Sequence, residues 1–476
     1  MKKLWRTLGT ILGTITVGVV FLTGCTNETS NINSGAAPVK VEGINIEGSG
    51  QSSQHQNGDR ITLTLGVLGY STVPMMQAVV ESYNAQSEKY YVEMVDYLPE
   101  YYDNAIYEAS EDRFRMDLAT GKGTDIILFG DMVADELGHA GVVADLNTFL
   151  TTEDKQEKYL GNILECSQTG DALYEISPTF TLSFIAGDGS RIGMENGWTM
   201  EEMLESFKRN GRDGLALAKG QGRTVARLVE YSIEDYVNWD TGTADFCKEE
   251  FYHILEFGKA IDNSEWIRPT RESVASGTHL ASCEGLTDMA GIQYLEWLFG
   301  DNVAVKGYPS SHGTGVAVDI GWDSMGISSY SQYPEGAWDF LEFYVEAAWT
   351  EREFYAEDTL IKVDFSHYFP GFPVNRQLFE EMLAQSMVQQ DLPNGEPYPL
   401  LQGEDERPDF YANTAEDVQK LREVIALADR RYFSGQSVIS QIIEEEISGY
   451  NAGVLTAEQT AAKIQNRVQL YLDEQK

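Results

Sequence analysis

Positive charge is scarce in this sequence. Lys and Arg number 34 against 75 Asp and Glu, which gives a formal net charge of −41. A surface with this balance repels phosphate backbones, so nucleic acid is excluded as a natural partner. The acidity is typical of a solvated exterior and by itself indicates no particular acidic site.

The sequence also lacks the short motifs that mark common catalytic and metal sites. It contains no H-E-x-x-H, no G-x-x-x-x-G-K-[ST] and no G-x-S-x-G, and its six histidines are scattered. Gly187-Asp188-Gly189 and Gly220-Gln221-Gly222 are bare Gly-x-Gly pairs, which are typical of loops. We therefore expect no catalytic residue, no metal site and no cofactor.

Cysteine is rare as well. Apart from Cys25, the chain has only Cys166, Cys247 and Cys283, an odd number at wide spacing. Neither a disulfide framework nor a zinc pattern can be read from them. We expect these three side chains to be small buried hydrophobes.

The N-terminal region has the order of a secretory signal. Basic residues at positions 2, 3 and 6 precede a mostly apolar stretch over 8–22, which is short for a bilayer-spanning helix. The stretch ends in L-T-G-C, which resembles the lipobox of bacterial lipoproteins. We expect residues 1–24 to be a signal peptide and Cys25 to be the lipidated residue; the alternative is a simple signal peptide with a chance cysteine.

Residues 25–59 are rich in Gly, Ser, Asn and Gln and hold too few apolar side chains for a core. A flexible coil of this length spans on the order of 30 Å, enough to hold a folded body off a membrane. No second run of eighteen apolar residues follows, and about 415 residues remain, which suffice for two or three domains.

From residue 61 the signals alternate between strand and helix. Strand patterns cover 61–67, 91–95 and 126–129, with helical patterns opening at Pro74 and running over about 101–120. This order predicts a parallel α/β sheet, in which ligands bind beyond the carboxyl ends of the strands. Those ends are Gly69-Tyr70-Ser71, Asp96-Tyr97 and Phe129-Gly130-Asp131.

The C-terminal third is predicted to be helical. Amphipathic patterns cover 338–349 and 437–447. Thr456 with Gln459 predicts a capping box for a last helix, in which Ala461, Ile464 and Val468 share one face.

Seven short sequence segments occur in the same order as similar segments of a known protein family. They are Gly121–Phe129 (GKGTDIILF, with Thr124 in place of the usual proline), Gly141–Leu150 (GVVADLNTFL), Asp171–Pro178 (DALYEISP, with Ser177 inserted), Val237–Phe257, Gly307-Tyr308-Pro309 with Gly313 and Gly315, Glu335–Phe343 (EGAWDFLEF) and Phe372–Asn375 (FPVN). Each is weak alone, but their order resembles the extracellular solute-binding proteins of family 1, the maltose-binding-protein-like class.

The resemblance implies a type II periplasmic-binding-protein-like fold, with two α/β lobes joined by a hinge. It assigns 60–176 and 308–362 to lobe 1, and 177–307 and 363–476 to lobe 2. It implies the substrate-binding subunit of an ABC importer, not an enzyme, which captures a small solute between the lobes and passes it to the permease. Such a monomer would be lipid-anchored on the outer face of the bacterial cytoplasmic membrane.

A sugar site needs aromatic faces that stack on pyranose C–H groups, and polar groups that pair with hydroxyls. Candidates at loop positions are Tyr70, Phe129, Asp131, Phe180, Trp239, Asp240, Tyr308 and Trp322. Asp131 follows a buried strand and Trp239 lies between polar residues, which favours a ligand-facing role for both side chains. For each aromatic the alternative is core packing.

Two other classes of function stay open. A surface glycosidase or lyase would also carry aromatics and acids, and a glycosidase needs two carboxylates about 5 to 9 Å apart. A structural or adhesive lipoprotein would bind no small ligand saturably. The family also includes binders of polyamines and other solutes, so an oligosaccharide is the more specific part of the prediction.

Overall fold

The structure is a computed structural model. It describes residues 60–98, 102–212, 217–218, 224–239, 241–262, 269–321, 323–347, 350–356, 359–364, 369, 371–391, 395–403, 407–432 and 438–474. The predicted signal peptide, Cys25 and the tether lie outside these residues, as do Asp240 and Trp322.

The first sheet has the strand order β11-β3-β1-β2. Its strands are β1 (Ile61–Val67), β2 (Tyr90–Asp96), β3 (Ile126–Leu128) and β11 (Met325–Ile327). The first three are parallel, and β11 runs antiparallel to β3. Because Leu63, Leu65 and Val67 alternate with polar residues or glycine, β1 places these three side chains in the core.

Helices connect and cover this sheet. They are η1 (Tyr70–Thr72), α1 (Pro74–Gln86), α2 (Asn104–Ala119), α3 (Ala134–His139), η2 (Leu146–Thr148) and α11 (Pro334–Ala347). The intervening η3 (Asp154–Lys158) and α4 (Gly161–Cys166) pack toward the second sheet instead. Met75, Val79, Val80 and Tyr83 of α1 are buried, as their spacing on one helical face predicts. We call this sheet with its helices the first lobe.

The second sheet has the order β15-β10-β4-β8-β5, with β9 and β14 also paired to β4. Its strands are β4 (Thr179–Asp188), β5 (Leu217–Ala218), β8 (Ala281–Leu286), β9 (Val303–Val305), β10 (Val316–Asp319), β14 (Phe372–Pro373) and β15 (Ala428–Arg431). β10 is parallel to β15 and antiparallel to β4.

The second lobe is this sheet with its helices and one small hairpin. The helices are α5 (Gly189–Ile192), α6 (Met200–Arg209), α7 (Thr224–Glu230), η5 (Ile233–Asp235), α8 (Glu249–Asp262), α9 (Arg271–Ala275), α10 (Gly291–Phe299), α12 (Arg376–Ser386), α13 (Ala415–Ala426), α14 (Val438–Asn451) and α15 (Ala457–Glu474). The hairpin is β6 (Val237–Asn238) with β7 (Thr243–Ala244). A separate hairpin, β12 (Glu351–Ala356) with β13 (Thr359–Asp364), lies near α1.

The chain passes between the two sheets three times: after Ile176, after β10, and again between α11, which packs on the first sheet, and β14, which pairs with β4. Ile176 still pairs with Met325 of the first sheet, and β4 begins in the second sheet at Thr179. The return runs from the end of β10 at Asp319 to the start of β11 at Met325. The return therefore lies after β10, whereas the sequence assigned residues 308–362 to the first lobe; the division into lobes stays a prediction.

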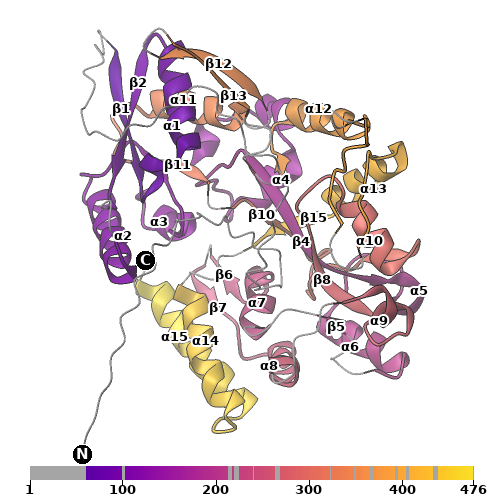
Figure 1. Ribbon diagram of the computed structural model, residues 1–476. Coiled ribbons are helices and arrows are strands. Elements are labelled where there is room, and N and C mark those ends of the chain that lie inside the picture. The colour runs from indigo at the N-terminus through magenta and orange to yellow at the C-terminus, as the bar shows by residue number, and fades with distance from the viewer. Residues whose placement is uncertain are drawn as a thin grey trace, which may run out of the picture.

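The carboxyl edges of the two sheets face each other at these crossings. Leu128, the last residue of β3, pairs with Met325, so the return enters the first sheet at the carboxyl end of its parallel strands. β10 and β15 end toward the same junction, because the return leaves directly from Asp319. Figure 1 shows the indigo first lobe and the magenta second lobe meeting there.

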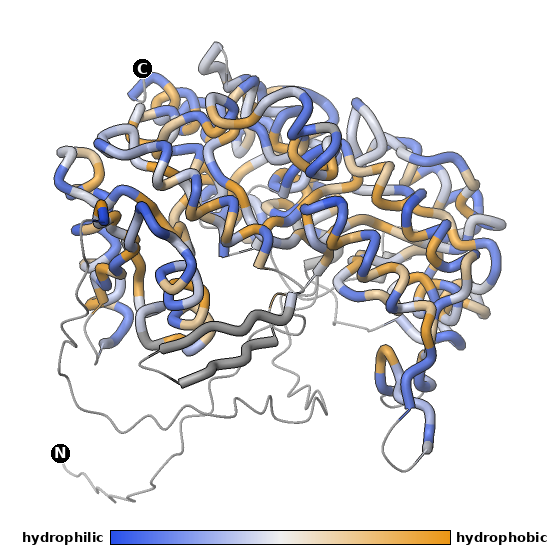
Figure 2. Tube along the Cα trace, turned by 90° about the horizontal axis from the view of Figure 1, so that it is seen from above, coloured by the Kyte–Doolittle hydropathy of each residue, from blue (hydrophilic) through white to orange (hydrophobic). Residues whose placement is uncertain are grey.

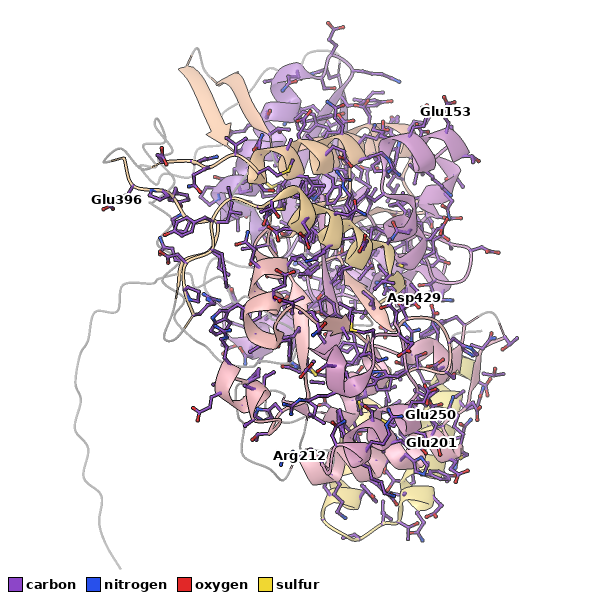
Figure 3. The ribbon with its side chains drawn as sticks, turned by 90° about the vertical axis from the view of Figure 1, so that its right-hand side faces the viewer. Glu153, Glu201, Arg212, Glu250, Glu396 and Asp429 are labelled. Atoms are coloured by element: carbon purple, nitrogen blue, oxygen red, sulfur yellow. The ribbon has the colours of Figure 1, made fainter. Side chains whose placement is uncertain are left out.

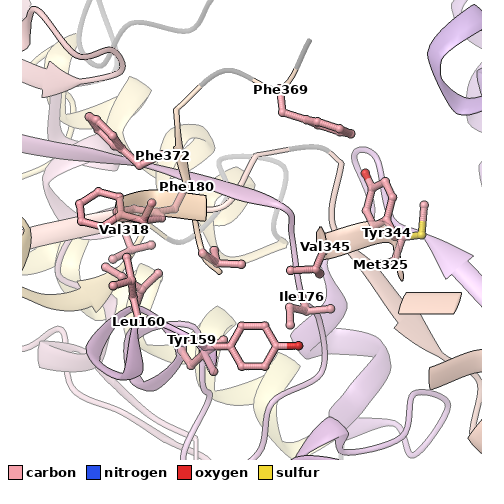
Figure 4. Packing of buried hydrophobic residues seen from close by; sticks show 14 of the residues in the cluster. Tyr159, Leu160, Ile176, Phe180, Val318, Met325, Tyr344, Val345, Phe369 and Phe372 are labelled. Carbon is pink, nitrogen blue, oxygen red and sulfur yellow. The ribbon is translucent and has the colours of Figure 1, made fainter. Parts of the chain in front are cut away.

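One hydrophobic cluster continues through the crossings. It includes Ile176, Phe180, Val318 and Met325, so both sheets contribute to it. Figure 4 shows Phe180 and Phe372 packed near Val318, with Met325 and Tyr344 further along. In Figure 2 apolar residues follow the inner strands while polar residues lie mainly outside. The hinge region is thus packed and not a bare linker.

The α/β class with two sheets is confirmed. The predicted capping box is present, since Thr456 N–H donates to Gln459 Oε1 at 3.0 Å and Gln459 N–H to Thr456 Oγ1 at 3.2 Å. The aromatic helix expected from 338 begins earlier, at Pro334. In the described part of the chain, no helix combines the length and apolar character needed to cross a bilayer.

Candidate functional site

A carboxylate organises the loop that follows β1. Asp96, the last residue of β2, accepts hydrogen bonds from the N–H groups of Gly69 (2.8 Å), Ser71 (3.3 Å) and Leu98 (3.0 Å), and from the Ser71 hydroxyl. Gly69 has φ 79°, a left-handed conformation that glycine adopts without strain. The loop therefore holds Tyr70 in place at the carboxyl edge, partly buried against the core.

The second polar group at this edge is Asp131, three residues beyond the end of β3. Its Oδ2 accepts a hydrogen bond of 2.9 Å from the hydroxyl of Tyr107 on α2. Burial, then the neighbouring Asp131 carboxylate, raises the pKa of Tyr107, and Tyr70 adds to this effect. Tyr70, Tyr107 and Asp131 therefore lie together, which brings two predicted site residues into one group.

Tyr107 was not predicted from the sequence. It lies in the irregular helical stretch whose hydrophobic pattern is weak, and nothing nearby in sequence connects it with Asp131. Only the packing of α2 across the sheet brings the two together.

On the second lobe, the β6–β7 hairpin presents Trp239. Its ring stacks on that of His139, with centroids 5.3 Å apart and an angle of 29° between the planes. His139 is the last residue of α3 and is exposed, while Trp239 is partly buried against the second-lobe core. A predicted ligand residue of one lobe thus contacts a helix of the other (Figure 1).

A buried ion-pair cluster links the lobes through Arg431 at the end of β15. Its guanidinium contacts Asp135 of α3 at 2.9 Å and Glu175 of the outward crossing at 2.5 Å. The side chains are 13%, 2% and 6% exposed, respectively. Burial raises the pKa of Glu175, with Arg431 opposing the shift, and Ser324 of the return crossing donates to the Glu175 carboxylate at 2.5 Å.

Two further second-lobe elements touch the same short helix. Glu136 of α3 accepts a hydrogen bond from the Val438 N–H at the start of α14, at 3.3 Å. Its carboxylate also bonds to Tyr471 of α15 and lies 3.7 Å from Arg115 of α2. α3 therefore contacts several elements of the second lobe: β15, the β6–β7 hairpin, α14 and α15.

The return crossing carries two carboxylates. Asp319 accepts a hydrogen bond from the Gly321 N–H at 2.9 Å, and burial raises its pKa. Burial also raises the pKa of Asp323 to about 6. Both acids thus lie where the two carboxyl edges meet.

Three predicted ligand residues are core residues in this conformation. Phe129, Phe180 and Tyr308 are each 1% exposed. Phe180 packs on Phe372 at 5.7 Å, and Tyr308 stacks on Tyr231 at 3.8 Å. They offer no surface to a ligand here, so the core alternative describes their environment. Asp240 and Trp322 lie outside the described residues, and their roles stay predictions.

Within the described ranges, no group of three or more His, Cys, Asp or Glu side chains is arranged to hold a metal ion. The cysteines there are free thiols. Cys166 is buried, as expected, and Cys283 is partly buried, but Cys247 is exposed, because it lies in the polar segment before α8.

No protein-family model matches this sequence, and no curated protein matches it. Solved structures similar in fold include an extracellular solute-binding protein family 1 from Alicyclobacillus acidocaldarius, at 13% identity, 87% coverage of this chain, 99% of that chain and a TM-score of 0.48. The cyclic alpha-maltosyl-1,6-maltose binding protein from Arthrobacter globiformis has 12% identity, 87% and 100% coverage, and a TM-score of 0.48.

The sugar-binding protein MalE from Xanthomonas citri has 11% identity, with 87% of this chain and 98% of that chain covered, and a TM-score of 0.48. All three similarities are at low identity. The structure is an α/β protein with two main sheets, and its similarity to these solved structures extends over 87% of the chain.

Proposed function

We propose that this protein is the extracytoplasmic substrate-binding lipoprotein of an ABC importer. It captures a small solute, an oligosaccharide, between its two lobes and delivers it to the permease. Cys25 anchors it to the outer face of the cytoplasmic membrane, and residues 25–59 give the folded body its reach. The protein is not an enzyme in this account.

One observation carries the proposal: the first lobe holds a polar and aromatic group at the carboxyl edge of its sheet, and an aromatic side chain of the second lobe contacts the first lobe at α3. Tyr70, Tyr107 and Asp131 stand on one side, and Trp239 on the other. Carboxyl edges of parallel strands are the usual ligand sites of α/β proteins. Tyrosine and tryptophan faces suit pyranose C–H groups, and carboxylates accept hydroxyl hydrogen bonds.

The arrangement of the connections supports capture between lobes. The crossings at Ile176 and Met325 are packed into a core that both sheets share. The lobes also meet at α3, which contacts Arg431, Trp239 and Val438. Such a molecule opens by rotation about the packed side, as hinge-closing binding proteins do.

A thermal-shift panel tests the proposal. A ligand that binds only the folded state stabilises it by RT ln(1 + [L]/Kd), about 2.7 kcal/mol at a hundredfold excess over Kd. In a chain of this size we expect a rise of a few degrees in Tm. We expect this rise with at least one oligosaccharide and none with amino acids or polyamines. A rise in Tm with polyamines alone would support a solute-binding protein but contradict the proposal that its ligand is an oligosaccharide.

A surface carbohydrate-active enzyme is the second candidate, and one observation favours it. Burial raises the pKa of Asp323 to about 6, which is the range of a carboxyl general acid. Incubation of the purified protein with any oligosaccharide that shifts Tm, followed by product analysis, separates the two candidates. Intact sugar after prolonged incubation supports the binding protein, and shorter products support the enzyme.

A further inference from the structure

We propose that the site selects its ligand by charge and takes a solute without carboxylate, phosphate or sulfate groups. This inference rests on the proposed function and narrows its ligand from oligosaccharides in general to those without acidic groups. It follows from the pairing of the cations and N–H donors near the facing edges with protein carboxylates and carbonyl groups, and from the acids that lie there.

Three arginines near the junction, within the part of the chain that the structure describes, are paired with protein groups. Arg431 pairs with Asp135 and Glu175, and its Nε is buried out of reach of a ligand. Arg430 contacts Asp429 at 2.9 Å and donates to the His312 carbonyl oxygen.

Arg115, on the first-lobe side, is engaged as well. It lies 2.9 Å from Glu111 and 3.7 Å from Glu136. A guanidinium is the usual partner of an acidic ligand, because it pairs with carboxylate or phosphate in a bidentate manner. The guanidinium groups of Arg431, Arg430 and Arg115 are therefore all paired with protein groups instead of being available to an acidic ligand.

The N–H groups that would suit an anion are also occupied. The turn after β1 directs the N–H groups of Gly69 and Ser71 inward, a typical anion-binding arrangement. Here the Asp96 carboxylate fills it, and the N–H of Leu98 joins the same carboxylate. The protein has thus placed its own anion where an acidic ligand would otherwise be held.

Acidic side chains of the protein also lie at helix N-termini of this edge. Asp103 caps α2 by accepting from the Ile106 N–H, and Asp135 and Glu136 lie in the first turn of α3. Only α1, among these three helices, begins without an acid at its N-cap or in its first turn. The acids at α2 and α3 offset the positive potential of those two helix ends.

The acids of the junction are in excess. Glu136, Glu175, Asp319 and Asp323 come from three separate segments, and burial is the largest cause of the raised pKa in each. Burial therefore favours the neutral carboxyl form of these groups. A neutral carboxyl group can donate to and accept from sugar hydroxyls, but it gives an anionic ligand no opposite charge.

The acidic exterior acts in the same direction at longer range. The net charge is −41, and Figure 3 shows acidic side chains such as Glu153, Glu201 and Glu396 at the periphery. Such a field slows the approach of anionic solutes, and salt screens it within about 10 Å at 0.1 M.

Matched sugar pairs test the inference. The probes are maltotriose, cellotriose, chitotriose and galactotriose, each with its counterpart oxidised at C6 to the uronate, and titration calorimetry measures Kd. We expect at least one neutral sugar to bind and its uronate to bind at least tenfold more weakly at 10 mM salt. Raising the salt to 1 M should narrow the gap.

Two variants locate the effect. Asp131→Asn keeps an acceptor for Tyr107 and removes one charge, so we expect the uronate-to-neutral ratio of Kd to fall about fivefold. Glu416→Gln removes the same charge from an exposed site and should leave the ratio unchanged. If Asp131→Asn lowers Tm strongly, Asp319→Asn makes the same test from the return crossing.

The outcomes separate the two proposals. A uronate that binds as tightly as its neutral partner overturns the charge selection and leaves the binding function standing. Equal effects of Asp131→Asn and Glu416→Gln would also overturn it, because the discrimination would then come from the general field. If no member of any pair binds, the proposed sugar-binding function fails, and the inference fails with it.

Discussion

Trp239 of the second lobe stacks on His139 of the first, with ring centroids 5.3 Å apart. His139 Nδ1 lies 2.7 Å from the carbonyl oxygen of Asp135, one turn earlier in α3. The carboxylate of Asp135 in turn contacts Arg431 of the second sheet. The aromatic contact and the ion pair therefore meet on one short helix, and α3 joins the two lobes through both of them.

The first prediction concerns this stack. Replacement of His139 by Ala should lower the free energy of unfolding by about 0.5–1.5 kcal/mol, the usual contribution of an aromatic pair. His139→Phe should restore most of the loss, because a phenyl ring can stack on Trp239 in the same way. Urea denaturation measures both. A phenylalanine variant as unstable as the alanine variant would show that the ring contact contributes nothing.

The second prediction concerns Arg431. Arg431→Met should cost about 3–5 kcal/mol, because it leaves the buried carboxylates of Asp135 and Glu175 without their cation. The matched control is Arg467→Met, whose pairs with Glu445 and Glu446 are more exposed and should be worth less than about 1 kcal/mol. Similar losses for both arginines in denaturant unfolding would mean that the lobes are not joined through Arg431.

The third prediction is a pH dependence that Asp323 produces. Its pKa is about 6 in the folded protein and near 4 in an unfolded chain, so between these values the folded state binds more protons. The free energy of unfolding should therefore fall as pH rises from about 4 to 6, by up to about 3 kcal/mol, and this contribution is constant above that.

Asp323→Asn isolates this contribution. The difference in unfolding free energy between the variant and the unmodified protein should grow in favour of the variant across pH 4 to 6 and then level off. A difference that does not change over this window would show that Asp323 ionises normally in the folded protein.

Local patterns predicted the first lobe well, because its signals are short in range. The alternation in 61–67 and the apolar run at 126–129 are properties of neighbouring residues, and both segments are strands. The same reasoning placed Tyr70 and Asp131 at strand ends, where the structure has them. Phe129 and Phe180 stand near strand ends too, but the adjoining core buries them, which the sequence pattern does not reveal.

The junction between the lobes was beyond prediction for a different reason. Arg431 and Asp135 are 296 positions apart, and Tyr107 and Asp131 come from different elements. The sequence around a charged residue at a strand end does not indicate which distant residue pairs with it. Across three hundred residues, many acids are possible partners. Trp239 could be chosen from its polar neighbours, whereas its partner His139 could not.

The fourth prediction concerns the anchor and rests on the L-T-G-C motif. Cys25→Ala should abolish lipidation, because no other thiol stands at the predicted cleavage site. Detergent phase partitioning of cell extracts measures this: the unmodified protein should enter the detergent phase, and the variant should stay in the aqueous phase. Equal partitioning of both would reject the lipoprotein assignment.

Binding measured with one residue changed on each lobe tests the central claim most directly. Calorimetry with an oligosaccharide that raises Tm should give a Kd at least tenfold weaker for Asp131→Asn, on the first lobe, and also for Trp239→Ala, on the second. Glu416→Gln, on the surface, should bind as the unmodified protein does. If either lobe's variant binds as tightly as that control, the ligand does not lie between the lobes.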